Sequence, residues 1–340
     1  MTEARFRQQA TETAAGVPYL RTPDSNFADL PDFAYEPRYL TYEGLRVHYV
    51  DAGPRNGPVA LLTQGMPTWS FLNRKLIRRL TDAGWRCIAP DHIGFGRSDK
   101  VVDPDWYSIT RHVDVHRHLV QTLDLRDYCL FCQDWGGPIG LSQAAEAPER
   151  VARLVIMNTW LHHDDYRYTE ALRNWNAQWK PGGFFDRNLP DPLSVGLLML
   201  MATQRLPRES IMALVTGGVQ PQIDAATDAI RRGYDAPFAG LDARALAGAR
   251  RFPLSLPFDN PVGGAAAAQA EWFASLQTWT KPIHFIWGGA DDVFTEEWGR
   301  SWANHYPQAT FDFLAGAGHF LQDTRGDEIA DVFLRRCAGS

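Results

Sequence analysis

Short apolar runs recur in the first and last parts of the chain, and most are followed by a polar or glycine-rich turn and then by helical periodicity. Continuous apolar runs are typical of strands buried on both faces of a parallel sheet, whereas alternating apolar and polar positions are typical of half-buried strands. The segment 45–51 alternates, and the segment 59–63 is continuously apolar. The pattern predicts strands at residues 38–42, 45–51, 59–63, 87–90, 128–133, 154–158, 282–288 and 310–314.

Helical periodicity follows most of these strands. We expect helices at residues 71–83, 109–123, 139–147, 296–305 and 327–336. Strands that alternate with helices favour a doubly wound, mostly parallel sheet, because parallel neighbours need a long crossover connection. The predicted fold class is therefore α/β.

The alternation breaks between residues 159 and 278, where Trp, Pro and Gly are frequent and helical pieces are separated by loops. An irregular stretch of that length is too long for a connection inside one compact domain, so it predicts a helical cap inserted into the core. The core is expected at residues 37–158 and 279–340. Residues 1–36 are expected to form a tail and a surface wrap, with residues 1–16 loose and weakly helical.

The composition is that of a soluble globular protein, with 45% hydrophobic residues, 22% charged residues and a formal net charge of −6. A net negative charge argues against nucleic acid or an anionic membrane as a partner. The longest apolar run, residues 195–202, is too short to span a bilayer, and residues 1–16 lack the apolar segment of a secretion signal. No pair of the four cysteines is accompanied by further residues at metal-ligand spacing. We therefore expect reduced thiols and a cytoplasmic protein.

The segment from Tyr128 to Leu141 carries the strongest chemical signal. A buried apolar run meets one carboxylate, Asp134, and breaks at Gly136 before helical periodicity resumes. A strand, a sharp turn and a helix with a reactive residue at the apex form the nucleophile elbow of α/β-hydrolases. The elbow needs small residues two positions before and after the nucleophile, and Cys132 and Gly136 stand there. The alternative interpretation is a buried strand that ends in an N-cap Asp.

Two further candidate residues follow predicted strands. Asp291 lies shortly after Gly288, and His319 follows the glycine-rich end of the last predicted strand. Ligands of open α/β sheets bind at the carboxyl ends of the strands, and the chain order nucleophile, acid, histidine is that of α/β-hydrolases. Each residue alone would be an ordinary loop or cap residue. Together they predict a catalytic triad of Asp134, Asp291 and His319.

A carboxylate nucleophile restricts the chemistry. It needs no adjacent base for activation, and its attack on an sp3 carbon displaces a leaving group and forms an alkyl ester on Asp134. His319 would then take a proton from water, while Asp291 orients the imidazole and stabilises its charged form. The pattern favours the opening of a C–halogen or C–O bond over ordinary ester hydrolysis.

A departing halide needs hydrogen-bond donors in a dry site, and an indole N–H is a donor on an apolar body. The chain has twelve Trp residues, which could pack a core or line an apolar pocket. Trp135 directly follows the expected nucleophile and is the first candidate. A second donor is expected from the cap, where Trp175 is preferred over Trp160 and Trp179. Core packing is the other interpretation of each cap tryptophan.

Several motifs together resemble the haloalkane dehalogenase family. They are Pro67-Thr-Trp-Ser-Phe-Leu, the segment 89–100, Cys132-Gln-Asp-Trp-Gly-Gly, Gly233-Tyr-Asp-Ala-Pro-Phe, Ala249-Arg-Arg-Phe-Pro and Gly318-His-Phe-Leu-Gln. The match runs from about residue 19 to the C-terminus and includes cap segments that α/β-hydrolases at large do not share. The resemblance implies an α/β-hydrolase fold, the triad named above, and Trp135 with Trp175 as halide ligands. It also implies a small apolar organohalide substrate, water, a halide product, no cofactor, and a monomer or small homo-oligomer.

One loop departs from the family pattern. The family usually has His-Gly-Asn-Pro or His-Gly-Glu-Pro after the third strand, whereas this chain has Gln64-Gly-Met-Pro. The thioether of Met66 cannot hold halide or catalytic water as the usual amide or carboxylate does. The backbone N–H groups of Met66 and Trp135 can still form an oxyanion hole, because that role needs no side chain. The cap segment 197–232 is also longer than usual, which leaves the pocket shape open.

Other activities remain open at this level. An epoxide hydrolase on the same fold would use cap tyrosines to protonate the opening oxygen, and Tyr166, Tyr168 and Tyr234 are available. A β-lactone-processing enzyme would use the same Asp and His on a strained C–O bond. The non-enzymatic alternative is a ligand-binding pseudo-hydrolase, which Gln64 and Met66 favour and the intact triad disfavours.

Overall fold

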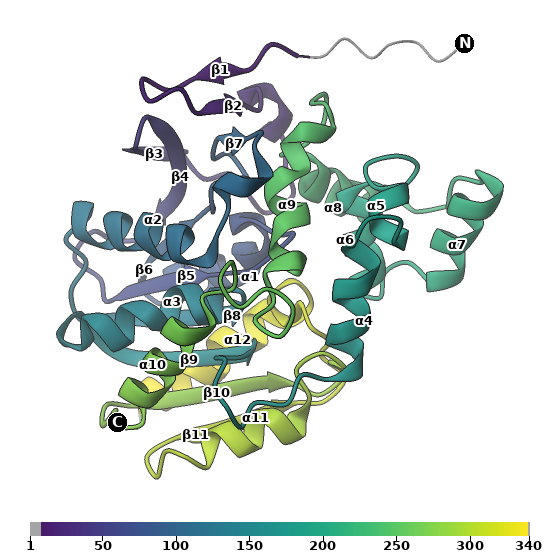
Figure 1. The fold of residues 1–340 in the computed structure, drawn as a ribbon. Coiled ribbons are helices and arrows are strands. Elements are labelled where there is room, and N and C mark those ends of the chain that lie inside the picture. The colour runs from purple at the N-terminus through teal and green to yellow at the C-terminus, as the bar shows by residue number, and fades with distance from the viewer. Residues whose placement is uncertain (1–7, 339–340) are drawn as a thin grey trace.

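The computed structural model describes residues 8–338. Its central sheet has helices on both faces (Figure 1). The strands are β3 (Arg38–Tyr42), β4 (Leu45–Ala52), β5 (Val59–Thr63), β6 (Arg86–Pro90), β8 (Tyr128–Asp134), β9 (Val151–Thr159), β10 (Ile283–Gly288) and β11 (Thr310–Leu314). They lie in the order β11-β10-β9-β8-β5-β6-β4-β3, with the pairs β3–β4 and β4–β6 antiparallel and the others parallel. The predicted doubly wound, mostly parallel sheet is confirmed.

Strand β8 lies in the middle of this sheet, between β5 and β9. Every residue of β8 is buried, which explains its continuous apolar run. After β5 the chain moves to β6 on one side, whereas β8 and β9 extend the sheet on the other side. The strand order therefore changes direction between β5 and β8, and such a switch point opens a crevice at the carboxyl ends of the strands. Asp134 and the loop that begins at Gln64 lie at that crevice.

The core helices differ from the predicted ones mainly at their first turns. They are α1 (Arg74–Asp82), α2 (Ile109–Thr122), α3 (Gly136–Glu146), α11 (Glu296–Ala303) and α12 (Leu321–Ala338). A 3₁₀ turn, Ser70–Asn73, precedes α1, so the α-helix starts later than the pattern predicts. Helix α12 starts earlier than predicted and contains non-helical backbone at Arg325, next to Gly326, which weakens the helical signal of that turn. Helix α3 starts at Gly136 rather than Ile139. Close packing of its first turn against Thr63 of β5 explains the glycine at position 136.

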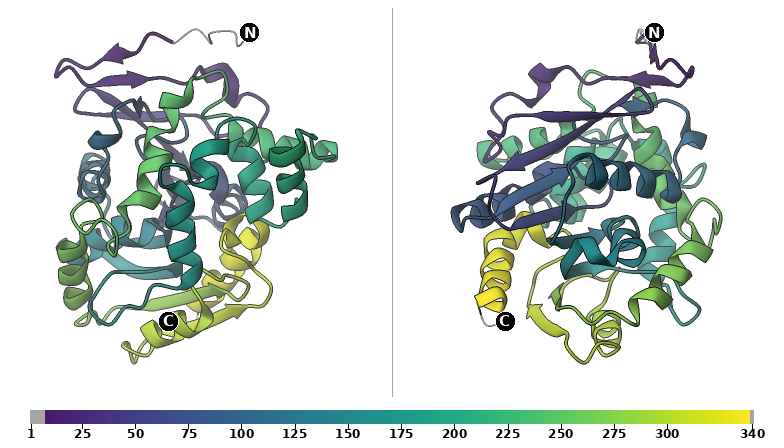
Figure 2. Two further views of the ribbon diagram at one scale, coloured as in Figure 1. Left: turned by 45° about the vertical axis from the view of Figure 1, so that its right-hand side comes forward. Right: turned by 90° about the vertical axis from the view of Figure 1, so that its left-hand side faces the viewer.

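All regular secondary structure of residues 160–278 is helical, and none of these residues lies in a strand. Its helices are α4 (Glu170–Trp179), α5 (Phe184–Asn188), α6 (Val195–Ala202), α7 (Arg208–Gly217), α8 (Ala225–Asp235), α9 (Ala247–Arg251) and α10 (Ala266–Leu276). Helices α4 to α8 lie together at one side of the sheet, with α7 outermost (Figures 1 and 2). Helix α10 instead packs against α3, and the indole of Trp272 donates a hydrogen bond to Glu146.

The N-terminal segment differs from its prediction. Residues 1–7 lie outside the described part, and residues 11–20 form a hairpin of β1 (Thr11–Glu12) and β2 (Pro18–Leu20) rather than a weakly helical tail. Strand β2 also pairs with β7 (Lys100–Val101), which adds a small second sheet. The turn uses Gly16 at φ 77°, a backbone conformation that glycine adopts without strain. Pairing with a distant strand therefore overrides the local helical tendency.

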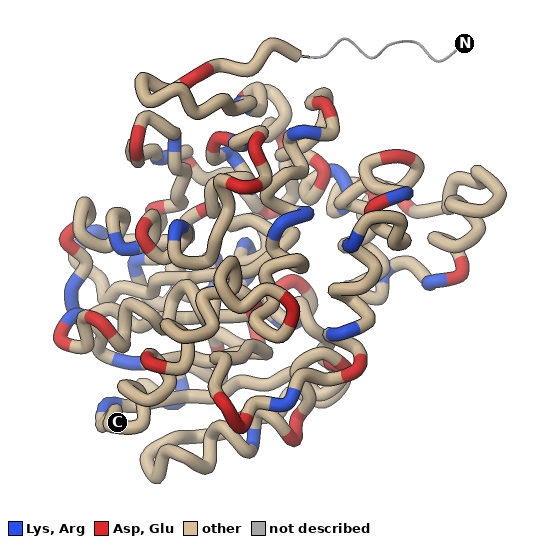
Figure 3. Tube along the Cα trace, viewed as in Figure 1, with Lys and Arg blue, Asp and Glu red and all other residues tan. Residues whose placement is uncertain are grey.

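Charged residues of both signs are interspersed over the whole trace (Figure 3). No large basic face is visible in this view, in agreement with the formal net charge of −6. Among the described helices, none has both the length and the apolar composition that crossing a membrane would need.

Candidate active site

Asp134 stands at the apex of a tight turn between β8 and α3. Its φ is 52°, a left-handed conformation that an Asp adopts only at a local cost in energy. Glycines make room for this turn: a Cβ at Gly136 would lie 2.0 Å from the carbonyl oxygen of Thr63, and a Cβ at Gly65 would lie 1.8 Å from Asp134 Oδ1. The strand, strained apex and closely packed helix are the geometry of a nucleophile elbow.

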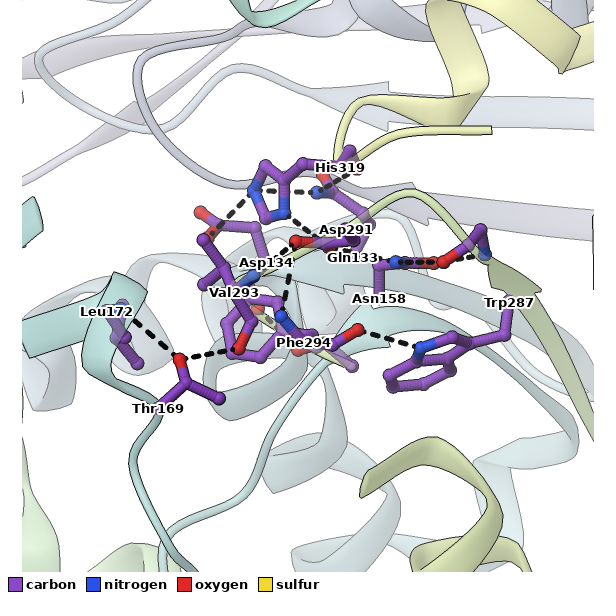
Figure 4. Close-up of polar contacts among 12 residues, drawn as sticks. Gln133, Asp134, Asn158, Thr169, Leu172, Trp287, Asp291, Val293, Phe294 and His319 are labelled. Carbon is purple, nitrogen blue, oxygen red and sulfur yellow. Dashed lines mark hydrogen bonds and ion pairs between the residues drawn. The ribbon is translucent and has the colours of Figure 1, made fainter. Parts of the chain in front are cut away.

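The structure brings the three predicted triad residues together (Figure 4). His319 Nδ1 lies 2.9 Å from Asp291 Oδ2, and His319 Nε2 lies 3.4 Å from Asp134 Oδ2. The Nδ1 contact fits an imidazole ring that carries a proton on Nδ1 and donates a hydrogen bond to Asp291. The other ring nitrogen then faces the carboxylate at the elbow.

Asp291 is held from three sides. Its Oδ1 accepts backbone N–H groups from Val293 (2.8 Å) and Phe294 (3.2 Å), and its Oδ2 accepts the side-chain amide of Asn158 (2.8 Å). Asn158 also accepts the backbone N–H of Gly288 and donates to its carbonyl, so it ties the ends of β9 and β10 together. The sequence analysis did not single out Asn158, although its place at the end of a predicted strand was a usable signal.

The charge state of His319 depends on the two carboxylates. Burial lowers the pKa of His319, but the attraction and hydrogen bonds of Asp291 and Asp134 outweigh burial and raise it to about 10. The imidazole is therefore a cation at neutral pH as long as both carboxylates are ionised. Loss of either negative charge would move the equilibrium toward the neutral base.

The loop that departs from the family pattern contacts Asp134 through its backbone. The N–H of Met66 donates to Asp134 Oδ1 at 3.1 Å, while the backbone N–H of Trp135 makes no such contact with that carboxylate in the part of the chain described. The side chain of Gln64 points elsewhere: it donates to the carbonyl of Pro90 at 2.7 Å and accepts from Asn73 at 3.2 Å. Gln64 therefore has a structural role in this loop.

A cavity of about 230 Å³ opens above Asp134. The loops at the carboxyl ends of the strands form one wall, and helices α4 and α6 form the other. Helices α4 and α6 contribute apolar side chains, and among residues 8–338 no Lys or Arg lines the cavity. The lining residues are Met66, Pro67, Asp134, Leu172, Trp175, Leu198, Ala202, Gln204, Ala290, Asp291, Asp292, Val293, Gly318, His319 and Phe320. Within residues 8–338 no cluster of three or more His, Cys, Asp or Glu side chains is arranged to hold a metal ion.

The four candidate tryptophans take different positions. Trp175, on α4, lines the cavity. Trp135 is buried against Trp160 and Phe252, with ring centroids 4.7 and 5.4 Å away, and it does not belong to the cavity lining. Trp160 stacks on the ring of Phe294, and Trp179 packs in the cap; neither lines the cavity. The cavity thus distinguishes Trp175 from its two alternatives.

The three candidate tyrosines lie away from the cavity. The hydroxyl of Tyr168 is 2.8 Å from His162 Nδ1, and that of Tyr234 donates to Asp323 at 2.9 Å. Tyr166 is buried beside Trp298. None of the three is among the cavity-lining residues, so this arrangement offers no phenolic donor to an opening epoxide.

The fold and the site define an α/β-hydrolase with an Asp at the nucleophile elbow. Residues 58–326 match the family described as alpha/beta hydrolase fold. A haloalkane dehalogenase of Psychrobacter cryohalolentis is 38% identical over 324 residues, which cover 93% of this chain and 97% of the relative. The tetrameric haloalkane dehalogenase DpaA of Paraglaciecola agarilytica has a TM-score of 0.76 at 30% identity, and the match covers 92% of this chain and 97% of that one. The chain belongs to the haloalkane dehalogenase family.

A more distant relative acts on another class of compound. The cis-3-alkyl-4-alkyloxetan-2-one decarboxylase of Shewanella oneidensis is 29% identical over 304 residues, which cover 87% of this chain and 86% of the relative. Its name denotes a β-lactone substrate.

Proposed function

We propose that the protein hydrolyses small haloalkanes to an alcohol and a halide ion through an alkyl ester on Asp134. The observation that carries this proposal is the position of the Asp134 carboxylate, which faces an apolar cavity and His319 at once. An apolar cavity suits an uncharged organohalide, and a carboxylate is a competent nucleophile toward its sp3 carbon.

The two oxygens of Asp134 have different environments, which suggests their roles. Oδ1 accepts the N–H of Met66 at 3.1 Å, whereas Oδ2 has the longer 3.4 Å contact with His319 Nε2, so we assign Oδ2 as the oxygen that attacks the carbon. The new C–O bond forms with an Oδ2 electron pair, and the halide leaves with the electrons of the C–halogen bond. Oδ1 then becomes the ester carbonyl oxygen, already placed at a backbone donor that would stabilise the oxyanion of the second step.

The second step needs a neutral histidine. Once Asp134 is an ester, its negative charge is gone, and one cause of the raised pKa of His319 disappears with it. His319 would then accept a proton from a water whose oxygen attacks the ester carbon. Cleavage of the ester releases the alcohol and regenerates Asp134, with a net release of one proton and one halide. Asp291 would stabilise the imidazolium through its Nδ1 contact.

The indole N–H groups of Trp135 and Trp175 are the halide ligands that we propose. Neither donates a hydrogen bond within the described residues. The same holds for the indoles of Trp160 and Trp179, so the choice rests on position. Trp175 reaches the cavity from α4. Trp135 directly follows the proposed nucleophile in the chain.

A second candidate function is the opening of a β-lactone, which the similarity to the Shewanella oneidensis decarboxylase favours. Asp134 and His319 could act on a strained C–O bond with no change of position. Breaking the ring C–O bond of a β-lactone frees a carboxylate that stays attached to the opened molecule. No halide would therefore be released. Product analysis separates the two activities.

The test is halide release from a panel of 1-bromoalkanes, beside turnover of a dialkyl β-lactone. We expect bromide release by the wild type and none by Asp134→Asn. His319→Phe should accumulate a species heavier by the mass of the alkyl group, because attack proceeds while hydrolysis stops. The double variant Asp134→Asn/His319→Phe is the matched control and should gain no mass. Release of bromide without any alkylated His319→Phe would refute the covalent route.

A further inference from the structure

Gln133 precedes Asp134 in β8 and is fully buried. Its carboxamide lies against His319 at two points (Figure 4). Nε2 of Gln133 is 3.1 Å from the backbone carbonyl oxygen of His319 and 3.3 Å from the ring nitrogen Nε2 of His319. The second contact is with the nitrogen that faces Asp134 and that would take the proton from water.

The orientation of this amide follows from its neighbours. A backbone carbonyl oxygen can only accept a hydrogen bond, so the atom of Gln133 that lies next to the carbonyl of His319 must be the NH₂ group. The oxygen of the same amide lies 3.5 Å from the side-chain nitrogen of Gln322, at the start of α12. A flipped amide would set two oxygens against each other at the His319 carbonyl.

The two hydrogens of the NH₂ group then have separate directions. One is taken by the carbonyl of His319, and the other faces the imidazole Nε2. A neutral imidazole with its proton on Nδ1 presents a lone pair to that hydrogen. An imidazolium would present a second N–H group there, and two donors that face each other repel. The amide therefore favours the neutral form of His319.

The charged groups around His319 favour the opposite form. Asp134 faces it from the elbow, Asp291 faces it from the loop after β10, and Asp292 lines the same cavity. The cavity residues on α4 and α6 carry no charge, and the aromatic neighbours Phe294 and Phe320 are neutral. The amide of Gln133 therefore favours the neutral imidazole, whereas Asp134 and Asp291 favour the charged form. The amide still contacts His319 after Asp134 has become an ester.

We propose that Gln133 is a positioning residue that keeps His319 neutral during hydrolysis of the alkyl-enzyme and so sets the pH above which that step proceeds. This inference rests on the proposed function. Gln133 acts through His319 and need not touch the substrate. The contact of 3.3 Å is long enough for water to replace it at the lone pair when hydrolysis begins.

The test is the pH dependence of single-turnover hydrolysis of the alkyl-enzyme, followed by mass spectrometry after rapid mixing with 1-bromohexane. Gln133→Glu keeps the shape but replaces the donor with a carboxylate, so the pH of half-maximal rate should rise by about one unit or more, and the rate below that pH should fall about tenfold. Gln133→Met lacks the donor without adding charge and should give a smaller upward shift. Both variants should approach the wild-type rate at high pH.

Gln143 offers a matched control, because it is a buried glutamine on α3 whose amide bonds to Ser142. Gln143→Met should leave the pH midpoint unchanged. A purely structural role for Gln133 would lower the rate at every pH with the wild-type midpoint, and that outcome in both Gln133 variants would overturn the inference. A wild type that forms no alkyl-enzyme would instead refute the proposed function, so the two failures are distinguishable.

Discussion

A buried charge cluster joins the cap to the core, and its central carboxylate is Asp323 on α12. Asp323 is fully buried and pairs with Arg74 of α1 at 2.6 Å and with Arg205 of the segment after α6. It also accepts the hydroxyl of Tyr234 on α8 at 2.9 Å. One carboxylate therefore compensates a fully buried guanidinium of the core and two polar groups of the cap.

Replacing Asp323 with Asn should lower the free energy of unfolding by about 3–5 kcal/mol, because it leaves Arg74 buried without its counter-charge. The pH dependence follows from the same contacts. Burial raises the pKa of Asp323, but Arg74 and Arg205 outweigh burial and the net pKa is lowered. A lowered carboxyl pKa means that this stabilisation is present above about pH 4, the ordinary value for Asp, and is lost as the pH falls through the folded-state pKa.

The assay is urea unfolding monitored by tryptophan fluorescence at pH 7 and at a series of pH values from about 4 down to about 2. Asp327→Asn is the matched control on the same helix, because Asp327 is half-exposed and pairs with Arg78 at the surface. An exposed pair contributes no more than about 1 kcal/mol. Equal losses for Asp323→Asn and Asp327→Asn would refute the reasoning. So would an Asp323→Asn variant whose stability deficit does not shrink as the pH falls from about 4 toward about 2.

Two further predictions concern the halide site and acid stability. Trp175→Phe should weaken halide affinity about tenfold, measured by halide-induced quenching of tryptophan fluorescence, because it removes a hydrogen bond to the anion. Trp179→Phe should leave the affinity unchanged, and the reverse result would assign the role to Trp179. Burial lowers the pKa of His116 to about 3. Below about pH 6.5 this imidazole therefore binds a proton in the unfolded chain but stays neutral in the folded chain. His116→Gln should therefore reduce the stability loss between pH 6.5 and 5 by up to about 2 kcal/mol in urea unfolding, whereas the half-buried control His118→Gln on the same helix should not.

The central strands and the position of the predicted triad were predictable from the sequence, because each follows from one simple rule. A run such as Val59–Thr63 can be buried on both faces only as a central strand, and the structure has it as β5. The convergence of Asp134, Asp291 and His319 followed from a topological rule, because the carboxyl ends of parallel strands share one edge of the sheet. The family resemblance and this rule pointed to the same residues.

The features that the sequence left hidden depend on distant partners. The hairpin of β1 and β2 forms beside β7, about eighty residues further along the chain, and no local pattern encodes that pairing. The amide of Gln133 reaches His319 only because β8 and the start of α12 meet in the folded chain. A glutamine inside a buried strand was itself a signal, since a buried polar group needs a partner. The sequence could not say which partner.

The loop Gln64–Pro67 shows why a change of side chain there need not remove the site. The family residue at position 66 is usually an amide or a carboxylate, and Met66 offers neither. The contact to Asp134 is made by the backbone N–H of Met66, and Gly65 provides the space for the carboxylate. The side chain of Gln64 holds the loop by hydrogen bonds to Pro90 and Asn73. The backbone carbonyl oxygen of Gln64 lies 2.7 Å from His92 Nε2. The backbone thus keeps the position of the proposed nucleophile, and the side chain at position 66 is free to shape the cavity.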